Sequence, residues 1–189
     1  SKPGGYGKIS LARGFELSSN TVLVQSVYDS YKNNPKQFVD RINSYGLNKP
    51  LGLPIKGEGK PVIPQPGTNR WSGVALPWMA FGYGLSVTPL QTLTLYNAVA
   101  NDGVMVKPIF VSEIKEWNKT IKKYNTEVIN PKICSQETLD KVQAVLENVV
   151  KRGTGSKLYS KDFSMAGKTG TAQVNYKDKS KLYYASSFV

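Results

Sequence analysis

Apolar residues recur at helical spacing in the stretch after Pro35. Asn34 stands where an N-cap is expected, and Pro35 suits the first position of a helix. The apolar positions of this stretch are Phe38, Val39, Ile42 and Tyr45. Residues three and four apart share one face of a helix, and Gly46 interrupts the pattern. We therefore predict a surface helix over 35–45 with one buried stripe.

Capping signals and spacing predict four further helices. Two short helices are expected over 10–16 and 20–31, with the sequence Ser-Ser-Asn of residues 18–20 at their junction, where capping side chains are expected. Thr88, Pro89 and Gln91 match an N-cap, a first helical position and a capping-box partner, which predicts a helix running to about Asn101. The last helix is predicted over 135–152. Its apolar face consists of Leu139, Val142, Val145, Leu146 and Val149.

Breaker residues and β-prone runs account for most of the remaining chain. Five prolines and five glycines fall within 47–73, so we expect a long loop there. Residues 104–111 are rich in β-formers, and two strands are predicted at 165–174 and 182–189. The polar linker 175–181 would join these two strands as an antiparallel hairpin. Helices in the middle and a hairpin at the end indicate the α+β class.

Composition excludes several kinds of chemistry. The chain of 189 residues has the length of one domain, and it contains no His and a single Cys, Cys134. A Ser-His-Asp triad, a Cys-His dyad, a His-ligated zinc site and an internal disulfide are therefore excluded within it. No apolar run approaches the roughly 18 residues of a membrane helix. Any catalysis within these residues must depend on other groups.

The net charge of +12 makes anionic partners plausible, among them nucleic acid, membrane surfaces and cell-wall polymers. The basic clusters at 115–123, 151–161 and 177–181 are interpreted as solvated loops or helix faces. Lysine greatly outnumbers arginine, which occurs only at Arg13, Arg41, Arg70 and Arg152. Surfaces that read bases usually use the planar fork of Arg, so this balance disfavours specific nucleic-acid recognition.

The segment Ala166–Ala172 carries a Lys-Thr-Gly sequence between small residues. A P-loop is excluded because Asp162 stands where that motif needs its first Gly. Lys168 offers a positive charge, Thr169 and Thr171 offer hydroxyls, and the adjacent glycines, including Gly170, would let a ligand approach the backbone. The segment could therefore bind a carboxylate along a strand edge. The alternative is an edge strand whose Lys discourages aggregation.

Ser18 and Asn20 form a second polar motif, Ser-x-Asn. At a junction between a loop and a helix, the Ser hydroxyl could relay a proton and the Asn carboxamide could hold a substrate amide. A plain N-cap without chemistry is the alternative. Ser-x-Asn followed about 150 residues later by Lys-Thr-Gly matches two of the three motifs of penicillin-binding proteins and class A β-lactamases. The combination is much more specific than either motif alone.

The chain resembles the class B penicillin-binding proteins, which are monofunctional peptidoglycan transpeptidases. The resemblance rests on residues 15–20, 82–91, 153–155 and 166–172, in the family's order. Ser19 stands where class A β-lactamases carry Asp, which favours a transpeptidase over a lactam hydrolase. The resemblance implies the α+β penicillin-binding fold shared with serine β-lactamases, an antiparallel sheet with a helical subdomain. It implies no cofactor and no metal.

The resemblance also implies a serine acyl-enzyme mechanism. In that family an active Ser attacks the D-Ala carbonyl of a stem peptide, D-Ala leaves, and an amine of a neighbouring strand resolves the acyl-enzyme. By position, Ser18 would relay the proton and Asn20 would hold the donor amide. Lys168 would raise the positive potential. Thr169 and Thr171 would bind the terminal carboxylate next to Gly170, and the main-chain N–H of Thr171 would complete the oxyanion hole.

The nucleophile motif Ser-x-x-Lys is missing upstream of Ser18. Its only match, beginning at Ser112, follows Ser18 in a charged stretch and is interpreted as a chance match. The chain opens without Met, and its last residues form a β-prone run up to Val189. We therefore expect residues 1–189 to be an internal piece of a transpeptidase domain, lacking the front end with the acylated Ser and the final strand and helix. Alone, this piece should not acylate.

Three alternatives remain open from the sequence. A serine β-lactamase or a β-lactam-sensing domain shares the same motifs, a basic module could bind nucleic acid or anionic glycan, and a pseudoenzyme could be kept for partner contacts. The resemblance implies stem peptides and β-lactams as ligands, division or elongation proteins as partners, and no nucleic acid. It implies a parent anchored in the bacterial cytoplasmic membrane with this domain outside the cytoplasm. The piece itself could self-associate through an exposed sheet edge.

Overall fold

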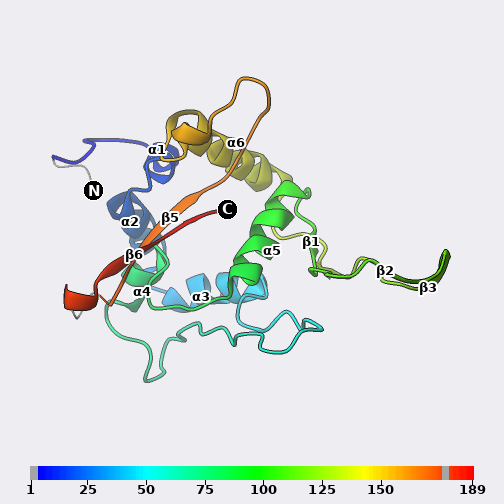
Figure 1. Cartoon of the computed structure of the whole chain (residues 1–189). Helices are drawn as coiled ribbons and strands as arrows, with labels where there is room; N and C mark the ends of the chain where they lie inside the picture. The colour runs from blue at the N-terminus through cyan, green and yellow to red at the C-terminus, as the bar shows by residue number, and fades with distance from the viewer. Residues whose placement is uncertain (1–3, 176–178) are drawn as a thin grey trace. The chain divides into compact units, whose positions relative to one another are not determined.

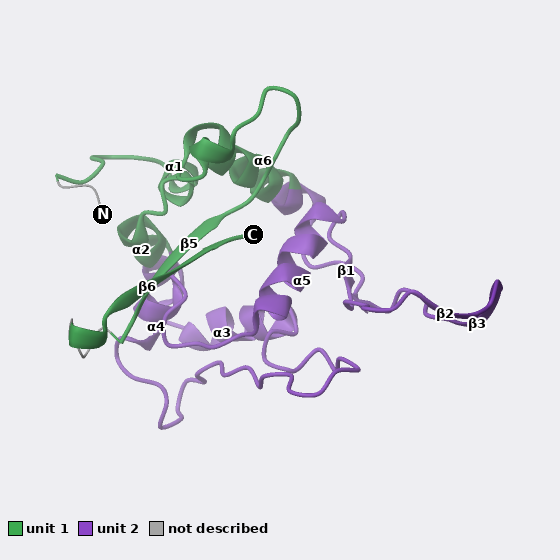
Figure 2. Ribbon diagram, in the orientation of Figure 1, with its two compact units in different colours: residues 1–26, 140–189 green, residues 27–139 purple. Residues whose placement is uncertain are grey.

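The computed structural model describes residues 4–175 and 179–189, and it divides the chain into two compact units (Figure 2). Unit 1 comprises residues 1–26 and 140–189, and unit 2 comprises residues 27–139. The boundaries fall inside two helices, α2 (Asn20–Tyr31) and α6 (Gln136–Arg152). Residues far apart in sequence therefore share unit 1, which contains every residue of both polar motifs.

Unit 1 combines helices from both ends of the sequence with one strand pair (Figure 1). Besides its parts of α2 and α6, it contains α1 (Leu11–Glu16), the short 3-10 helices η1 (Ser156–Leu158) and η2 (Lys179–Lys181), and the strands β5 (Thr169–Val174) and β6 (Tyr183–Phe188). The predicted antiparallel hairpin is confirmed, with Thr169 opposite Phe188 and Val174 opposite Tyr183. The first strand begins at Thr169 instead of near Met165. Part of the predicted linker, residues 176–178, lies outside the described residues.

Local features explain where α1 begins and how it meets α2. The Ser10 hydroxyl accepts a hydrogen bond from the Arg13 N–H at 3.2 Å and caps the helix. Gly14 faces the next helix so closely that an added Cβ would clash with the Val22 side chain. The lack of a side chain at Gly14 thus lets α1 and α2 meet at the junction that carries Ser18.

Unit 2 contains the helices predicted to begin at Pro35 and Pro89, one further short helix at 75–79 that was not predicted, and most of the buried apolar residues. Its helices are α3 (Pro35–Ser44), α4 (Ala75–Met79) and α5 (Pro89–Ala100), and its strands are β1 (Met105–Val106), β2 (Glu113–Glu116), β3 (Lys119–Lys123) and β4 (Val128–Asn130). One core cluster forms around Val39, Ile63 and Met79. A second forms around Ala98, Met105 and Ile133. The stripe predicted for the helix at 35–45 is confirmed by the burial of Val39 in the first cluster.

The capping box at the start of α5 is present as predicted. The Thr88 hydroxyl accepts from the Gln91 N–H at 3.1 Å, and the Gln91 side chain accepts from the Thr88 N–H at 2.8 Å. At α3 the prediction is only partly met, because Asn34 precedes the helix without a side-chain capping bond. The long region 47–73 is a loop apart from a single bridge between Val62 and Ser86.

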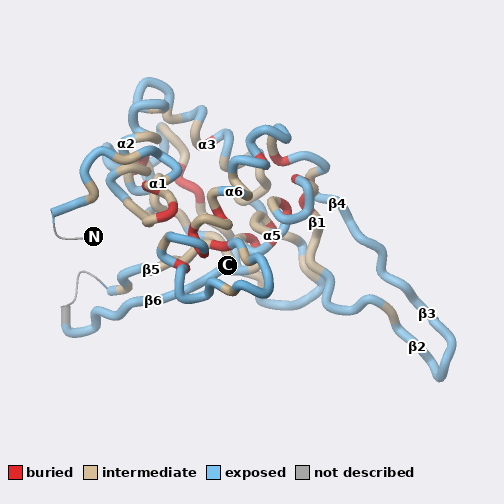
Figure 3. Tube along the Cα trace, turned by 90° about the horizontal axis from the view of Figure 1, so that it is seen from above, coloured by how far each residue is buried: buried red, intermediate tan, exposed pale blue. Residues whose placement is uncertain are grey.

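The strands of unit 2 differ most from the prediction. Only Met105 and Val106 of the β-prone stretch 104–111 form a strand, and β1 pairs with β4. Residues 113–123, which include the basic cluster 115–123 predicted to be a solvated loop or helix face, form the antiparallel hairpin β2–β3. Figure 3 shows this hairpin exposed almost throughout, so its sequence has no alternation of apolar and polar residues to reveal it. The chance match at Ser112 lies at the start of this hairpin and not on a helix.

Within the part of the chain that the structure describes, no helix combines the length and apolar character needed to span a bilayer.

Candidate active site

Ser18 lies in the tight connection between α1 and α2. Its φ angle of 52° is in the left-handed region, which non-glycine residues seldom adopt. The turn is held by main-chain bonds from Ser18 N–H to the Phe15 carbonyl at 3.0 Å and from Ser19 N–H to the Gly14 carbonyl at 2.8 Å. The backbone therefore fixes the direction of the half-buried Ser18 side chain.

Lys168 brings the second motif to Ser18. Its ammonium donates hydrogen bonds to the Ser18 hydroxyl and, at 2.9 Å, to the Thr169 carbonyl. The ammonium also lies over the Phe15 ring, 5.6 Å from its centroid. The main chain of Lys168 pairs with that of Val189. The Lys168 N–H donates to the Val189 carbonyl at 2.7 Å, and the Val189 N–H donates to the Lys168 carbonyl at 3.2 Å, so the β5–β6 ladder continues by one residue pair. Two residues 150 positions apart thus meet within unit 1.

Thr154 adds a third hydroxyl to this cluster. Its side-chain oxygen lies 3.4 Å from the Ser18 oxygen and 2.6 Å from the Thr169 oxygen, both within hydrogen-bond distance. Ser18, Thr154 and Thr169 therefore form a chain of hydroxyl groups beside the Lys168 ammonium. We call these four residues the Ser18–Lys168 cluster. Thr154 is absent from the predicted site residues, although its turn, residues 153–155, is part of the family resemblance.

The other predicted site residues lie near this cluster without bonding to it. Asn20 is the exposed first residue of α2, and among the described residues no side-chain hydrogen bond joins it to the cluster. Together with Ser18 it lines a cavity of about 560 Å³ in unit 1. Thr171 is exposed on β5, on the same face as Thr169 because side chains alternate along a strand.

Gly170 and Gly167 lie close to strand β6. An added Cβ at Gly170 would lie 2.5 Å from the Ser187 hydroxyl, and one at Gly167 would clash with the Phe188 ring. At Gly167 the ring and the nearby Val189 carbonyl leave no room for a side chain, whereas at Gly170 the contact is with a hydroxyl that can rotate. The predicted approach of a ligand to the backbone at these glycines stays a prediction.

The electrostatics of the cluster are set by Lys168. Burial of its half-buried side chain lowers the pKa of Lys168 below the ordinary value of 10.5. Its two hydrogen-bond acceptors are neutral oxygens, so no carboxylate offsets the loss of solvation. The site thus combines a positive charge that is partly shielded from water with several hydroxyl donors. This combination suits an anionic ligand such as a carboxylate.

We predict that Lys168 titrates below 10.5 in the folded protein. In the window between that lowered pKa and 10.5, the unfolded chain binds more protons than the folded chain, so the free energy of unfolding rises with pH. An NMR titration of the lysine side chains, with Lys168→Arg to assign the resonance, measures the midpoint. A midpoint at or above 10.5 would contradict the burial-based explanation.

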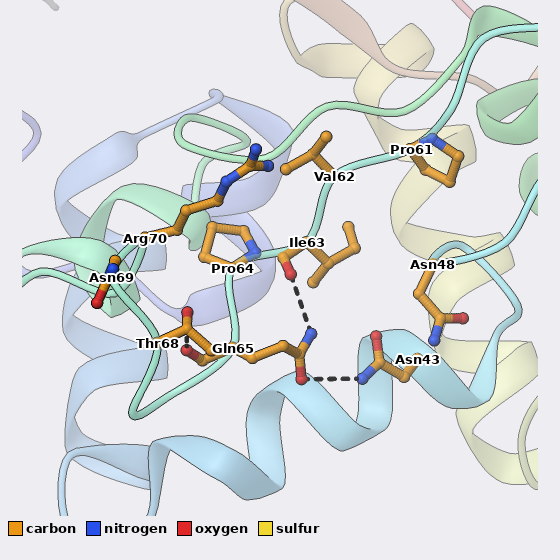
Figure 4. A pocket seen from close by; sticks show the side chains of 10 residues that line it. All are labelled: Asn43, Asn48, Pro61, Val62, Ile63, Pro64, Gln65, Thr68, Asn69 and Arg70. Carbon is orange, nitrogen blue, oxygen red and sulfur yellow. Dashed lines mark hydrogen bonds between the residues drawn. The ribbon is translucent and has the colours of Figure 1, made fainter.

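The described residues provide no obvious metal centre, since no group of three or more His, Cys, Asp or Glu is placed to hold an ion. A larger cavity of about 790 Å³ lies in unit 2 and is lined by a proline-rich loop and polar side chains (Figure 4). Within it Gln65 donates to the Ile63 carbonyl at 3.0 Å and accepts from Asn43 at 3.4 Å. These amides bond to one another, and neither polar motif contributes to this cavity. The candidate active site is therefore in unit 1.

The known proteins that are similar to this chain include penicillin-binding proteins and transpeptidases. The family model of the penicillin binding protein transpeptidase domain matches residues 1–189. Penicillin-binding protein PbpB of Mycobacterium tuberculosis is 32% identical over 168 residues, which cover 84% of this chain and 24% of that protein. Peptidoglycan D,D-transpeptidase FtsI of Escherichia coli is 31% identical over 136 residues, which cover 71% of this chain and 21% of that protein.

A solved structure shows the same fold. The crystal structure of penicillin binding protein 3 of Mycobacterium tuberculosis complexed with ampicillin aligns with a TM-score of 0.76 and 29% identity, covering 94% of this chain and 40% of that chain. The predicted α+β penicillin-binding fold is thereby confirmed. The chain spans about a quarter or less of the length of the two curated relatives. It belongs to the transpeptidase domain family of class B penicillin-binding proteins.

Proposed function

We propose that the full-length protein containing this chain is a D,D-transpeptidase that cross-links peptidoglycan stem peptides through a serine acyl-enzyme. The single observation that supports this most strongly is the hydrogen bond from the Lys168 ammonium to the Ser18 hydroxyl. It joins the Ser-x-Asn and Lys-Thr-Gly motifs, which the reaction needs on two sides of one substrate. The family relationship and the name of the FtsI relative point to the same reaction.

Each group of the cluster has a defined task in this proposal. The acylated Ser comes from a Ser-x-x-Lys segment outside residues 1–189, so that these residues form part of a transpeptidase domain completed elsewhere in the parent chain. Ser18 passes a proton between the Lys of that segment and the leaving amine. Lys168 holds Ser18 and supplies positive potential, and Asn20 holds the donor amide.

The substrate carboxylate is assigned to β5. Thr169 and Thr171 share one face of this strand and offer hydroxyl donors, next to Gly170. The main-chain N–H of Thr171 stabilises the oxyanion of the tetrahedral intermediate. Because the Thr169 hydroxyl also contacts Thr154, the carboxylate site and the proton relay are linked through one hydroxyl.

The proposal extends to ligands, location and partners. β-Lactams, one of which is present in the ampicillin complex of the M. tuberculosis structure, would acylate the same Ser. The parent would be anchored in the bacterial cytoplasmic membrane, with this domain outside the cytoplasm and in contact with division or elongation proteins. In isolation, residues 1–189 would associate through the exposed face and edges of the β5–β6 pair.

Labelling with a fluorescent penicillin tests the proposal. The full-length protein is expected to form a stable covalent adduct with one active-site Ser, and residues 1–189 alone are expected to form none, because the nucleophile is elsewhere. Mass spectrometry over hours measures the adduct and its loss. An adduct on residues 1–189 would overturn the assignment of the nucleophile. Rapid release of hydrolysed penicillin by the full-length protein would instead indicate a β-lactamase.

A further inference from the structure

Glu16 is a fully buried carboxylate at the end of α1, two residues before Ser18. Its two oxygens bind two different arginines. One oxygen accepts from Arg13 at 2.8 Å, and the other accepts from Arg152, at the end of α6, also at 2.8 Å. Arg13 in addition donates to the Arg152 carbonyl at 3.1 Å. One buried charge thus connects the ends of two helices that are 136 residues apart in sequence.

The main chain joins the same two places. The Thr154 N–H donates to the Glu16 carbonyl at 3.1 Å. Gly153 passes so close that an added Cβ would clash with this carbonyl and would lie 2.8 Å from the Val149 Cα. The turn 153–155 therefore packs directly against the main chain of Glu16, the last residue of α1. This main-chain contact sets the position of Thr154.

We propose that Glu16 is a positioning residue for the proposed transpeptidase. By holding Arg13 and Arg152, its carboxylate fixes the turn 153–155 against α1, and this places the Thr154 hydroxyl between Ser18 and Thr169. The inference rests on the proposed function for its effect on activity. Glu16 is fully buried two residues before Ser18, and it acts on the reaction only through Thr154 and the Ser18–Lys168 cluster.

Position 16 requires the negative charge of a carboxylate and not only a side chain of the same shape. Burial by itself would raise the pKa of Glu16, but hydrogen bonds from Arg152 and Arg13 and their positive charges hold the pKa below its ordinary value. The carboxylate therefore stays ionised at neutral pH. A neutral isostere would leave the two guanidinium groups close together without the anion that orients both of them.

The test compares Glu16→Gln and Glu16→Asp with Glu147→Gln in the full-length protein. Glu147 is the matched control, since its carboxylate also binds a cation and a hydroxyl, Lys151 at 2.9 Å and Ser164 at 2.6 Å, but none of the cluster residues. For penicillin acylation we expect Glu16→Gln to lower the acylation rate constant about tenfold or more, because small displacements of positioned groups are costly. The dissociation constant of the complex before acylation should change less than about threefold. Glu16→Asp should recover part of the rate, and Glu147→Gln should match the wild type.

Two further readouts separate positioning from a general loss of stability. Thr154→Val should slow acylation, and adding Glu16→Gln to it should cause little additional loss, because Glu16 acts through Thr154. Hydrogen exchange by mass spectrometry should show faster exchange of the 152–156 segment in Glu16→Gln. Exchange of Gly167, whose N–H donates to the Leu146 carbonyl, should be unchanged.

The outcomes distinguish this inference from the proposed function. If the wild type is acylated and Glu16→Gln acylates at the same rate, the inference is wrong while the proposed function stands. If the wild type is not acylated, the proposed function is wrong, and hydrogen exchange alone decides whether Glu16 holds the turn. Unchanged exchange of the 152–156 segment in Glu16→Gln overturns the inference in either case.

Discussion

Replacing Lys168 with alanine in the full-length protein is expected to slow acylation by penicillin at least about a hundredfold, the lower range for loss of a group that stabilises charge in the transition state. Lys168 is half-buried, and its ammonium donates to both the Ser18 hydroxyl and the Thr169 carbonyl. Its removal takes away the charge that attracts the ligand carboxylate and leaves Ser18 without the bond that orients it. Stopped-flow or gel-based labelling measures the rate.

The control for this variant is Lys161→Ala. Lys161 is an exposed lysine of unit 1, so it matches Lys168 in type and in the charge that is removed, but it lies outside the Ser18–Lys168 cluster. Acylation of Lys161→Ala should equal that of the wild type, and both variants should unfold at similar temperatures. Acylation of a folded Lys168→Ala at the wild-type rate would contradict the function assigned to Lys168.

Sequence reasoning could predict the parts of the site that depend on local patterns. Ser18 and Lys168 each stand in a short motif, and the order of the motifs along the chain is typical of one family. Most of the helices followed from caps and apolar spacing, and the capping box at Thr88 is present as predicted. These features depend on neighbours in sequence, which is why they can be predicted.

The parts that sequence reasoning missed depend on contacts between distant residues. Nothing in the sequence indicates that Glu16 pairs with Arg152, because neither residue belongs to a local charge pattern that includes the other. The contact between Gly170 and its cross-strand neighbour Ser187 likewise depends on a residue that is distant in sequence. The hairpin β2–β3 was missed because its two strands are exposed almost throughout and therefore lack apolar alternation.

The second large effect is expected from Ser18→Ala in the full-length protein. The Ser18 hydroxyl accepts from Lys168 and lies 3.4 Å from the Thr154 hydroxyl, so its loss interrupts the proposed proton relay. We expect acylation to slow about a hundredfold or more. Ser19→Ala is the matched control, because Ser19 is the adjacent half-buried serine and no bond joins its side chain to the described residues of the cluster. A wild-type rate for Ser18→Ala would contradict the relay.

The most direct test of the account is the double-mutant cycle that combines Ser18→Ala with Lys168→Ala and measures the rate of penicillin acylation in all four proteins. Residues that act as one unit show strongly non-additive losses. If the Ser18 hydroxyl and the Lys168 ammonium act together through their hydrogen bond, the double variant should be slower than Lys168→Ala alone by no more than about threefold. Full multiplication of the two single losses would mean that the two residues act independently, which would contradict the central claim.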